Sequence, residues 1–328
     1  MSKVLIVGGT GFIGSNIARQ LLDLNHEVVL FDAFIQYVPS RKENYGEITR
    51  KRLEGIEDKA VIARGDARNR GEIQRAIIEH KPDIIIQLAS MPISTLANVY
   101  TEEAVDCCIK AAINILEVIK DVRFVKRFVY TSSSMVYGDF QKDVADEGHP
   151  TEPREFYGGI KLAGEHAVKS FCRRYGIDYV IIRPSAVYGP TDINKRVVQI
   201  FVENAIEGKE IVLEGADQKL DFTYVKDAAK GFVLAALSEN AKNETFNITN
   251  GQARSLRELA DALKKHFPEL KVVEKPSDKT RPTRGTLDIS KAKKLLNFEP
   301  DYPLEKGVEE YIEFVKKNNY NPIIIKDC

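Results

Sequence analysis

This chain has no excess of positive or negative charge, no tryptophan and no pattern typical of metal ligands. Its 328 residues include 48 basic and 48 acidic side chains, which cancel, and no tryptophan. A balanced charge does not favour nucleic acid or an anionic membrane surface as a partner. The four cysteines, Cys107, Cys108, Cys172 and Cys328, have no CxxC or metal-site spacing. We therefore expect reduced thiols in a cytoplasmic protein and no bound metal.

Long apolar stretches are missing as well. No stretch approaches the ~20 apolar residues that a membrane-spanning helix needs. The apolar run at residues 4–7 starts almost at the initiator Met and ends at Gly8, which leaves no room for a secretory signal. We expect neither a membrane nor a nucleic acid as partner, and small molecules as the ligands.

Short β-branched runs alternate with amphipathic stretches over the first part of the chain. The alternation is typical of βαβ units and predicts an α/β fold with a Rossmann-like, doubly wound sheet of about six parallel strands. The predicted strands cover residues 4–7, 27–31, 60–64, 83–87, 127–131 and 179–183. The predicted helices cover residues 13–24, 71–80, 102–120 and 157–175.

The pattern loosens after Pro190, where loops rich in Lys, Gly and Pro separate short elements. We expect residues 1–183 to form the sheet domain and residues 184–328 to form mainly a smaller C-terminal α/β lobe that binds substrate. Residues 217–240 are expected to return to the sheet domain.

A glycine-rich loop follows the first predicted strand. Gly8, Gly11 and Gly14 give the spacing GxxGxxG between a strand and a helix. Glycines let the backbone approach a pyrophosphate, and free N–H groups at the helix start favour its negative charge. The loop therefore predicts a dinucleotide-binding domain.

The second predicted strand ends in an acidic residue, Asp32. A carboxylate at this place accepts hydrogen bonds from the adenosine ribose and repels a 2′-phosphate. Asp32 therefore favours NAD over NADP, although Arg41 and Lys42 lie close enough in sequence to leave NADP open.

Two side chains in the predicted helix at 157–175 form a candidate acid–base pair. Tyr157 and Lys161 stand four residues apart, hence on one face of the helix. A tyrosine hydroxyl has a reference pKa near ~10, and a nearby ammonium stabilises the phenolate so that it can act as a base. A serine cluster, VYTSSSMVYG at 129–138, ends a buried strand, where open parallel sheets bind their ligands.

Together these motifs resemble the extended short-chain dehydrogenase/reductase family, and within it the branch of NAD-dependent nucleotide-sugar epimerases and dehydratases related to UDP-glucose 4-epimerase. The resemblance covers nearly the whole chain. Its signatures are GGTGFIGS, GDARN, QLAS, DEGHPTEPREFYGGIK, IRPSAVYGP, DFTYVKD and RPTRGTLDISKAKKLLNFEP.

The resemblance implies roles for individual residues. Tyr157 would be the base, Lys161 would also hold the nicotinamide ribose, and Ser133, three residues before VYG, would donate a hydrogen bond to the sugar oxygen. The implied NAD contacts are Gly8, Gly11, Phe12, Ile13, Gly14, Asp32, Asp66, Ala67, Leu88, Ala89, Ser90, Tyr157, Lys161, Pro184 and Val187. The implied contacts with a nucleotide-diphosphate sugar are Ser94, Ser133, Ser134, Ala186, Arg196, Val197, Lys219 and Arg281.

The resemblance also implies a reaction. In this branch the tyrosinate removes a proton from a sugar hydroxyl, usually at C4, while hydride passes to the nicotinamide. An epimerase then returns the hydride to the other face of the keto sugar, so that NAD is regenerated. Epimerisation is the main interpretation, with a 4-dehydrogenase or 4-keto reductase as the alternative. A non-catalytic NAD-binding protein would be expected to lose the Tyr–Lys pair.

Two other reactions of the branch are disfavoured by the residues before VYG. The 4,6-dehydratases carry an Asp–Glu pair there, and the decarboxylases carry a Glu directly before VYG. This chain has Ser134 and Met135, neither of which can serve as the acid or base of an elimination.

Three positions depart from the UDP-galactose 4-epimerases. Ala186 and Leu220 stand where those enzymes have an Asn and an Arg that help hold the diphosphate, and Cys108 replaces an Asn in a helix. The candidate replacement cations are Arg196, Lys219 and Arg281.

A homodimer formed through the helices at 102–120 and 157–175 is also implied. The apolar positions at helical spacing on the first of these helices suit such an interface, although they also suit a core. They are Ile109, Ile113, Leu116 and Ile119.

Overall fold

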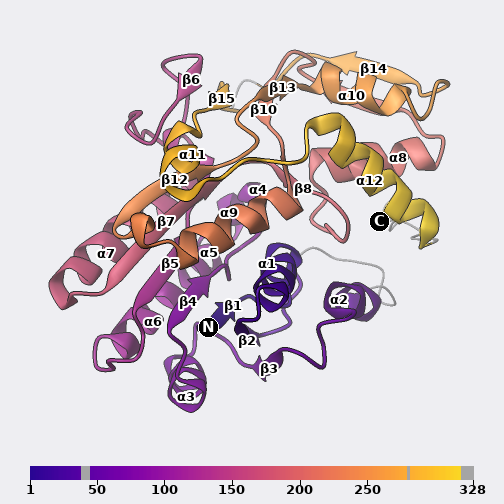
Figure 1. Ribbon diagram of the computed structural model, residues 1–328. Coiled ribbons are helices and arrows are strands. Elements are labelled where there is room, and N and C mark those ends of the chain that lie inside the picture. Colours follow the sequence, from indigo (N-terminus) through magenta and orange to yellow (C-terminus); the bar gives the residue numbers. More distant parts are fainter. Residues whose placement is uncertain (38–44, 279–280, 319–328) are drawn as a thin grey trace.

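The computed structural model describes residues 1–37, 45–278 and 281–318. Arg41, Lys42 and Cys328 lie outside these residues. A seven-stranded sheet with helices on both faces forms the centre of the molecule (Figure 1). The strand order is β12-β7-β5-β4-β1-β2-β3, and every neighbouring pair is parallel. The Rossmann-like, doubly wound fold predicted from the sequence is confirmed.

The strands of this sheet are short and mostly buried, because helices cover both faces. Along β1, Val4 and Ile6 pack into the core on one face, and Leu5 and Val7 into the core on the other. The strands are β1 (Lys3–Val7), β2 (Glu27–Asp32), β3 (Val61–Arg64), β4 (Ile84–Gln87), β5 (Arg127–Thr131), β7 (Asp178–Pro184) and β12 (Glu244–Ile248).

Each face of the sheet has its own layer of helices. The first layer contains α1 (Phe12–Asp23), α9 (Val225–Leu237) and α11 (Ser290–Leu296), whose apolar side chains share one core. The second layer contains α3 (Arg70–His80), α6 (Ala111–Ile119) and α7 (Phe156–Tyr175). Smaller elements near the ends of the strands are α2 (Tyr45–Leu53), α4 (Ser94–Val99) and the 3₁₀ turn η2 (Ser134–Tyr137).

The long helix predicted at 102–120 has an irregular middle. It runs as α5 (Thr101–Val105), a π-helical turn η1 (Asp106–Lys110) and α6 without a break in the chain. The widened turn contains Cys107 and Cys108, both buried. A π-turn inside an α-helix often marks a functional site, and this one lies beside the cavity described below.

A second lobe, upper right in Figure 1, packs around its own apolar core. Its helices are α8 (Val197–Ile206), α10 (Leu256–Lys264) and α12 (Leu304–Lys317). Its two-stranded pairs are β8 (Val187–Tyr188) with β11 (Thr223–Tyr224), β9 (Ile211–Glu214) with β14 (Val272–Lys275), and β10 (Lys219–Asp221) with β13 (Ala253–Ser255).

The chain passes between the two lobes more than once. Within residues 217–240, β10 and β11 lie in the second lobe, whereas α9 packs on the main sheet, and β12 follows as its edge strand. The short strand β15 (Thr286–Leu287) pairs with β6 (Val144–Ala145) of the first part of the chain. The division into domains 1–183 and 184–328 stays a prediction.

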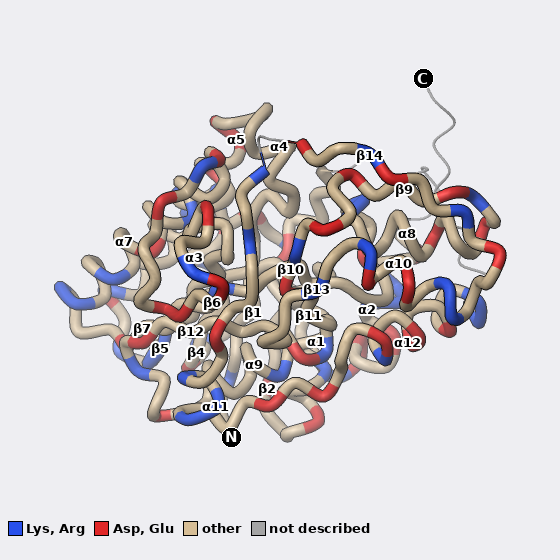
Figure 2. The backbone as a smooth tube through the Cα atoms, turned by 90° about the horizontal axis from the view of Figure 1, so that it is seen from above, with Lys and Arg blue, Asp and Glu red and all other residues tan. Residues whose placement is uncertain are grey.

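Basic and acidic side chains are interspersed along the described chain (Figure 2). None of the helices in the described ranges combines the length and apolar character needed to cross a membrane.

Candidate active site

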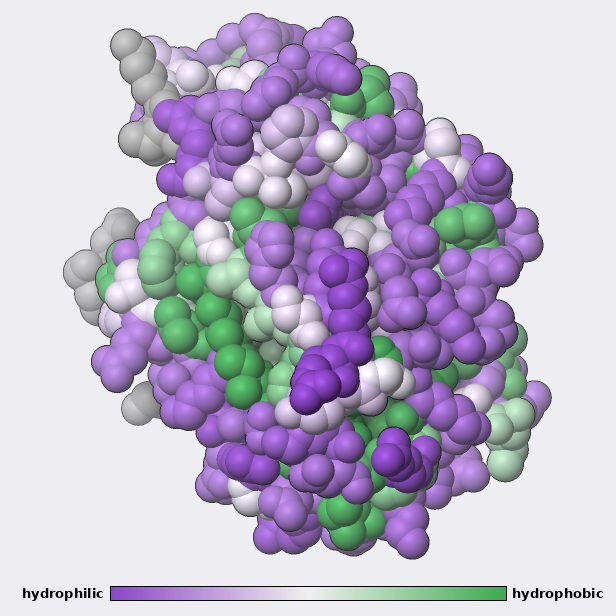
Figure 3. All heavy atoms as spheres, turned by 90° about the vertical axis from the view of Figure 1, so that its left-hand side faces the viewer, coloured by the Kyte–Doolittle hydropathy of each residue, from purple (hydrophilic) through white to green (hydrophobic). Residues whose placement is uncertain are grey.

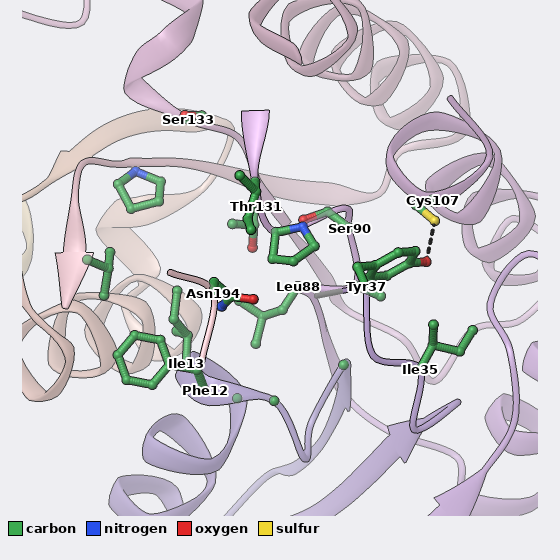
Figure 4. Close-up of a pocket in the computed structure, with 18 of the residues that line it drawn as sticks. Phe12, Ile13, Ile35, Tyr37, Leu88, Ser90, Cys107, Thr131, Ser133 and Asn194 are labelled. Atoms are coloured by element: carbon green, nitrogen blue, oxygen red, sulfur yellow. Dashed lines mark hydrogen bonds between the residues drawn. The ribbon is translucent and has the colours of Figure 1, made fainter. Parts of the chain in front are cut away.

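A cavity of about 490 Å³ lies at the C-terminal ends of the central strands, between the sheet and the second lobe. Its size is in the range of small-molecule sites, roughly 300–1,000 Å³. Ser133 and the Tyr37–Cys107 pair stand on different sides of this cavity (Figure 4). The carboxyl ends of parallel strands are where open α/β sheets bind their ligands.

The glycine loop forms one wall and leaves no room for side chains. Gly8 has φ +84°, and a Cβ there would lie 2.9 Å from the amide nitrogen of Ala89. A Cβ on Gly14 would lie 2.4 Å from the carbonyl oxygen of Gly8. Helix α1 begins directly after Gly11, which supplies no side-chain cap. The N–H groups of its first turn are therefore available to an anion, as a bound pyrophosphate requires.

Asp32 is fixed at the end of β2, on the cavity wall. Its two carboxylate oxygens accept hydrogen bonds from the backbone amides of Thr10, over 3.0 Å, and Phe34, over 2.8 Å. Each oxygen retains a further lone pair. The arrangement fits the ribose hydroxyls of NAD and is unfavourable for a 2′-phosphate.

A cluster of polar side chains lies along the cavity near Asp66. Arg68 donates hydrogen bonds to Asp66 and to Glu103 on α5. The hydroxyl of Tyr37 lies 2.8 Å from the sulfur of Cys107 and 3.2 Å from a Glu103 oxygen (Figure 4). Burial raises the pKa of the Cys107 thiol to about 11, so the sulfur stays protonated. Sequence reasoning missed Tyr37, Arg68 and Cys107. Arg68 lies within the GDARN signature, which points only to Asp66 and Ala67, and no motif contains Tyr37 or Cys107.

Ser133 and Tyr157 stand on the cavity wall. Ser133 caps the turn η2, and its hydroxyl oxygen accepts a hydrogen bond from the amide of Met135 over 3.2 Å. The hydroxyl hydrogen is therefore still available to donate. Tyr157 lies in the first turn of α7, which begins after Glu155.

Lys161 lies one helical turn further along and is buried behind Tyr157 rather than on the wall. Its ammonium donates to the carbonyl oxygen of Thr131 over 2.9 Å and lies 5.7 Å from the ring centre of Tyr157. Burial by itself would lower the pKa of Lys161, but the groups around it, Tyr157 and Cys108 first, raise it above its usual value. The ammonium therefore stays charged, with two N–H donors left for other partners.

The neighbouring serines differ in what they can do. Ser132 is buried and donates to Glu165 over 2.5 Å. Its hydroxyl hydrogen is therefore already used. Ser134 is also buried, and all three serines line the cavity.

The structure brings together most of the residues implied for the cofactor. Gly8, Gly11, Phe12, Ile13, Gly14, Asp32, Asp66, Ala67, Leu88, Ala89, Ser90, Tyr157, Pro184 and Val187 all line this cavity, and Lys161 lies behind it. Of the residues implied for the sugar nucleotide, Ser94, Ser133, Ser134, Ala186, Arg196 and Val197 line it.

Lys219 and Arg281 depart from that expectation, since neither lines the cavity. Lys219 is exposed because successive residues of a strand point to opposite faces, and its neighbour Leu220 takes the cavity side of β10. Arg281 is exposed and pairs with Glu214 on β9, 3.3 Å away.

Arg196 lines the cavity but is already engaged. Its guanidinium donates to the carbonyl oxygens of Pro92, over 2.9 Å, and Val187, over 3.2 Å, and lies 3.5 Å from Asp192. It thereby joins the loop after β4 to the second lobe. Ala186, which stands where the resemblance implies an Asn, has φ +39° and no polar side chain to offer.

Arg284 is the cation that sequence reasoning missed. It lines the cavity, and within the described residues it forms no hydrogen bond or ion pair. Burial lowers the pKa of this guanidinium, which nevertheless stays charged because its ordinary pKa is so high. An unpaired, partly desolvated cation beside a cavity is suited to an anionic ligand. The RPTR signature contains both arginines. Its second arginine, Arg284, lines the cavity, whereas the first, Arg281, does not.

Carboxylates are unevenly distributed around the cavity. Among the described residues that line it, only Asp32 and Asp66 carry a carboxylate, and both lie on the side of the glycine loop and the Arg68 cluster. The wall around Ser133 has Ser134 and Met135 instead. An acid-assisted elimination from the substrate therefore has no carboxyl group to use at that end.

Known proteins resemble this chain over nearly its whole length. A protein of Methanocaldococcus jannaschii named "Putative UDP-glucose 4-epimerase" is 30% identical over 322 residues, which cover 96% of this chain and 99% of the relative. Other curated relatives are named dTDP-glucose 4,6-dehydratases.

Two solved structures share the fold over nearly their whole length. The UDP-glucose 4-epimerase of Thermotoga maritima, crystallised with UDP-glucose, has a TM-score of 0.86 at 26% identity, covering 97% of this chain and 99% of that one. The UDP-glucuronic acid 4-epimerase of Bacillus cereus, crystallised with UDP-glucuronic acid and NAD, has a TM-score of 0.86 at 25% identity, covering 96% and 99%.

Residues 4–249, which contain the glycine loop, Asp32, Ser133, Tyr157 and Lys161, match the NAD dependent epimerase/dehydratase family. The chain therefore belongs to this family.

Proposed function

We propose that the protein is an NAD-dependent epimerase that inverts C4 of a nucleotide-diphosphate sugar. The observation that carries the proposal is the single cavity that combines a cradle for NAD with Ser133 and Tyr157 and has no carboxylate at the Ser133 end. A UDP-activated hexose or hexuronic acid is the substrate class, by analogy with the named relatives.

The chain's own residues provide acid–base chemistry and positioning. NAD, when bound, supplies a reversible hydride acceptor. Ser133 donates a hydrogen bond to the C4 oxygen, and Tyr157 takes the proton of the C4 hydroxyl and later returns it. Lys161 stabilises the phenolate through its charge. These roles require no further titrating group from the substrate lobe.

Arg284 and the start of α8 form the proposed site for the diphosphate. Helix α8 begins at Val197 on the cavity wall without a side-chain cap, so its first N–H groups can bind a phosphate oxygen. Arg284 contributes the positive charge that is absent at Leu220, where the resemblance implies an Arg.

Two other reactions of the family fit less well. A 4,6-dehydratase or a decarboxylase needs a carboxyl group near the sugar, which Ser134 and Met135 do not provide. A 4-dehydrogenase or 4-keto reductase must exchange its cofactor at each turnover. The bonds of Tyr37 to Glu103 and Cys107 join the segment after β2 to α5 and η1 beside the cavity, and such a link would slow the release of a bound cofactor.

A homodimer through the α5–α6 and α7 helices is part of the proposal. Val105 and Ile113 expose 36% and 40% of their surface, and with half-buried Ile109 they form an outward stripe. Leu116 and Ile119, also expected there, are buried in the core instead. The side of the molecule that includes α7 carries separate groups of apolar side chains among polar ones (Figure 3).

A cytoplasmic location is also proposed. The three described cysteines, Cys107, Cys108 and Cys172, are buried free thiols, which suits a reducing compartment.

Mass spectrometry of the small molecules released from purified, heat-denatured protein tests the cofactor, and incubation with UDP-sugars tests the reaction. Near-stoichiometric NAD(H) together with interconversion of a C4 pair of UDP-sugars is the expected result. Release of NADP(H), or net oxidation of a sugar with accumulation of NADH, would contradict the epimerase.

A further inference from the structure

Lys161 is held between two aromatic rings. Its ammonium lies 5.6 Å from the ring centre of Tyr130 on β5 and 5.7 Å from that of Tyr157. A cation within about 6 Å of a ring face is attracted by the electrons of the ring, most strongly when water is excluded. Tyr130 has no exposed surface and Lys161 only 1%, so the attraction acts in a dry environment.

Tyr130 is itself locked in place. Its hydroxyl donates to the carbonyl oxygen of Cys108 in the π-helical turn, over 3.5 Å. Gly164, on the adjacent turn of α7, leaves the space for that hydroxyl, because a Cβ there would lie 2.0 Å from it. Burial raises the pKa of the Tyr130 hydroxyl, so the ring stays a neutral phenol.

The surroundings of the ammonium contain few other groups that could hold it. The titratable groups that face it are Tyr157 on its own helix, Tyr130 on β5, and Cys107 and Cys108 on η1. Glu165, one turn further along α7, is paired with Arg183. The only hydrogen bond that Lys161 makes within the described residues goes to the uncharged carbonyl of Thr131.

We propose that Tyr130 is a positioning residue whose ring holds the Lys161 ammonium beside Tyr157. The ring compensates part of the cost of burying the charge and prevents the long lysine side chain from turning away. The inference rests on the proposed function only in that it gives Tyr157 the role of base. The arrangement of the three side chains does not depend on which sugar is bound.

The test is a titration without substrate. The absorbance of tyrosinate near 295 nm is followed against pH in the NAD-saturated protein, and the signal of Tyr157 is isolated by subtracting the same variant with Tyr157→Phe added. Tyr130→Leu removes the ring, Tyr130→Phe keeps it, and Phe128→Leu removes another fully buried ring from the same face of β5.

We expect Tyr130→Leu to move the Tyr157 titration to higher pH by about one unit, and Tyr130→Phe and Phe128→Leu to leave it in place. An unchanged titration in Tyr130→Leu, or an equal shift in Phe128→Leu, overturns the proposal. If Tyr130→Leu does not fold, Tyr130→Met, which fills more of the space of the ring, takes its place. An assay negative for epimerase activity alongside the expected shift would refute the proposed function and leave this inference standing.

Discussion

Arg183 and Glu165 form a bidentate ion pair in the core, in which the guanidinium donates to the two carboxylate oxygens over 2.8 and 2.7 Å. Removing Glu165 leaves the Arg183 guanidinium buried without a carboxylate partner. We expect Glu165→Ala to lower the free energy of unfolding by about 3–5 kcal/mol, measured by urea denaturation. Glu274→Ala breaks an exposed pair with Arg257 and should cost less than about 1 kcal/mol. Equal losses in both variants would contradict the importance of burial.

The same pair predicts a dependence of stability on pH. Burial alone would raise the pKa of Glu165, but the hydrogen bonds and charge of Arg183 outweigh it and hold the pKa below its usual value. The stabilisation is therefore complete above the unfolded pKa of about 4.3 and is lost as the pH falls below it. The difference in unfolding free energy between wild type and Glu165→Gln should stay constant from pH 7 to about pH 5 and shrink as the pH falls from about 4.3 toward the lower pKa of the folded state. A difference that is constant with pH would show that the carboxylate charge is not what stabilises the fold.

Tyr157→Phe tests the proposed base. The change removes one hydroxyl from a side chain on the cavity wall and should leave the fold and NAD binding intact. Because general acid–base catalysis typically contributes about 10²–10⁴-fold, we expect kcat to fall by at least about a hundredfold in the epimerase assay. Tyr175→Phe, an exposed position near the end of the same helix, is the matched control. Activity of Tyr157→Phe near that of wild type would refute the assignment.

The two arginines of RPTR give opposite predictions. Arg284 lines the cavity without a partner in the described residues, whereas Arg281 is exposed beside Glu214. Loss of a hydrogen bond to a charged group typically costs about 1.5–3 kcal/mol. Arg284→Ala should therefore raise KM for the nucleotide sugar about tenfold to a hundredfold, and Arg281→Ala should change it little. If Arg281→Ala raised KM more than Arg284→Ala did, Arg281 would be the residue that binds the diphosphate.

Retention of the cofactor should depend on the bonds across the cavity near Asp66. Tyr37→Phe removes the hydroxyl that contacts Glu103 and Cys107, and the loss of such bonds typically costs about 1 kcal/mol each. We expect NAD to dissociate roughly tenfold faster, measured as the NAD that remains after repeated gel filtration. Tyr100→Phe, at a 59% exposed position, is the control. Unchanged retention in Tyr37→Phe would mean that these bonds do not hold the cofactor.

The sheet and its main helices could be predicted from the sequence because each has a simple period. Short runs rich in β-branched and aromatic residues, such as β1 and β5, are typical of strands in a sheet that helices cover on both faces, and the glycines that precede α1 indicate its start. The adenosine end of the site could be predicted in the same way, because Asp32 ends the second strand at the usual spacing in sequence after the glycine loop.

The parts that could not be predicted depend on contacts between distant segments. Nothing in residues 106–110 distinguishes a π-turn from an α-helix, and Glu244–Ile248 becomes a sheet strand only because the edge of β7 is free to pair. The pairing of β15 with β6 places the segment that carries Arg284 beside residues 139–145, which follow the turn η2. A motif match cannot supply that register, and so the sequence alone does not show which of the two arginines of RPTR reaches the cavity.

Strand β12 is reached only after the chain has passed through the second lobe, and it covers the outer edge of β7. A fragment that stops before residue 244 would leave the N–H and C=O groups along that edge unpaired. Such an edge is a template for pairing with another chain. The first 183 residues expressed alone are therefore expected to aggregate, because the sheet that they form is completed only by a strand from the later part of the chain.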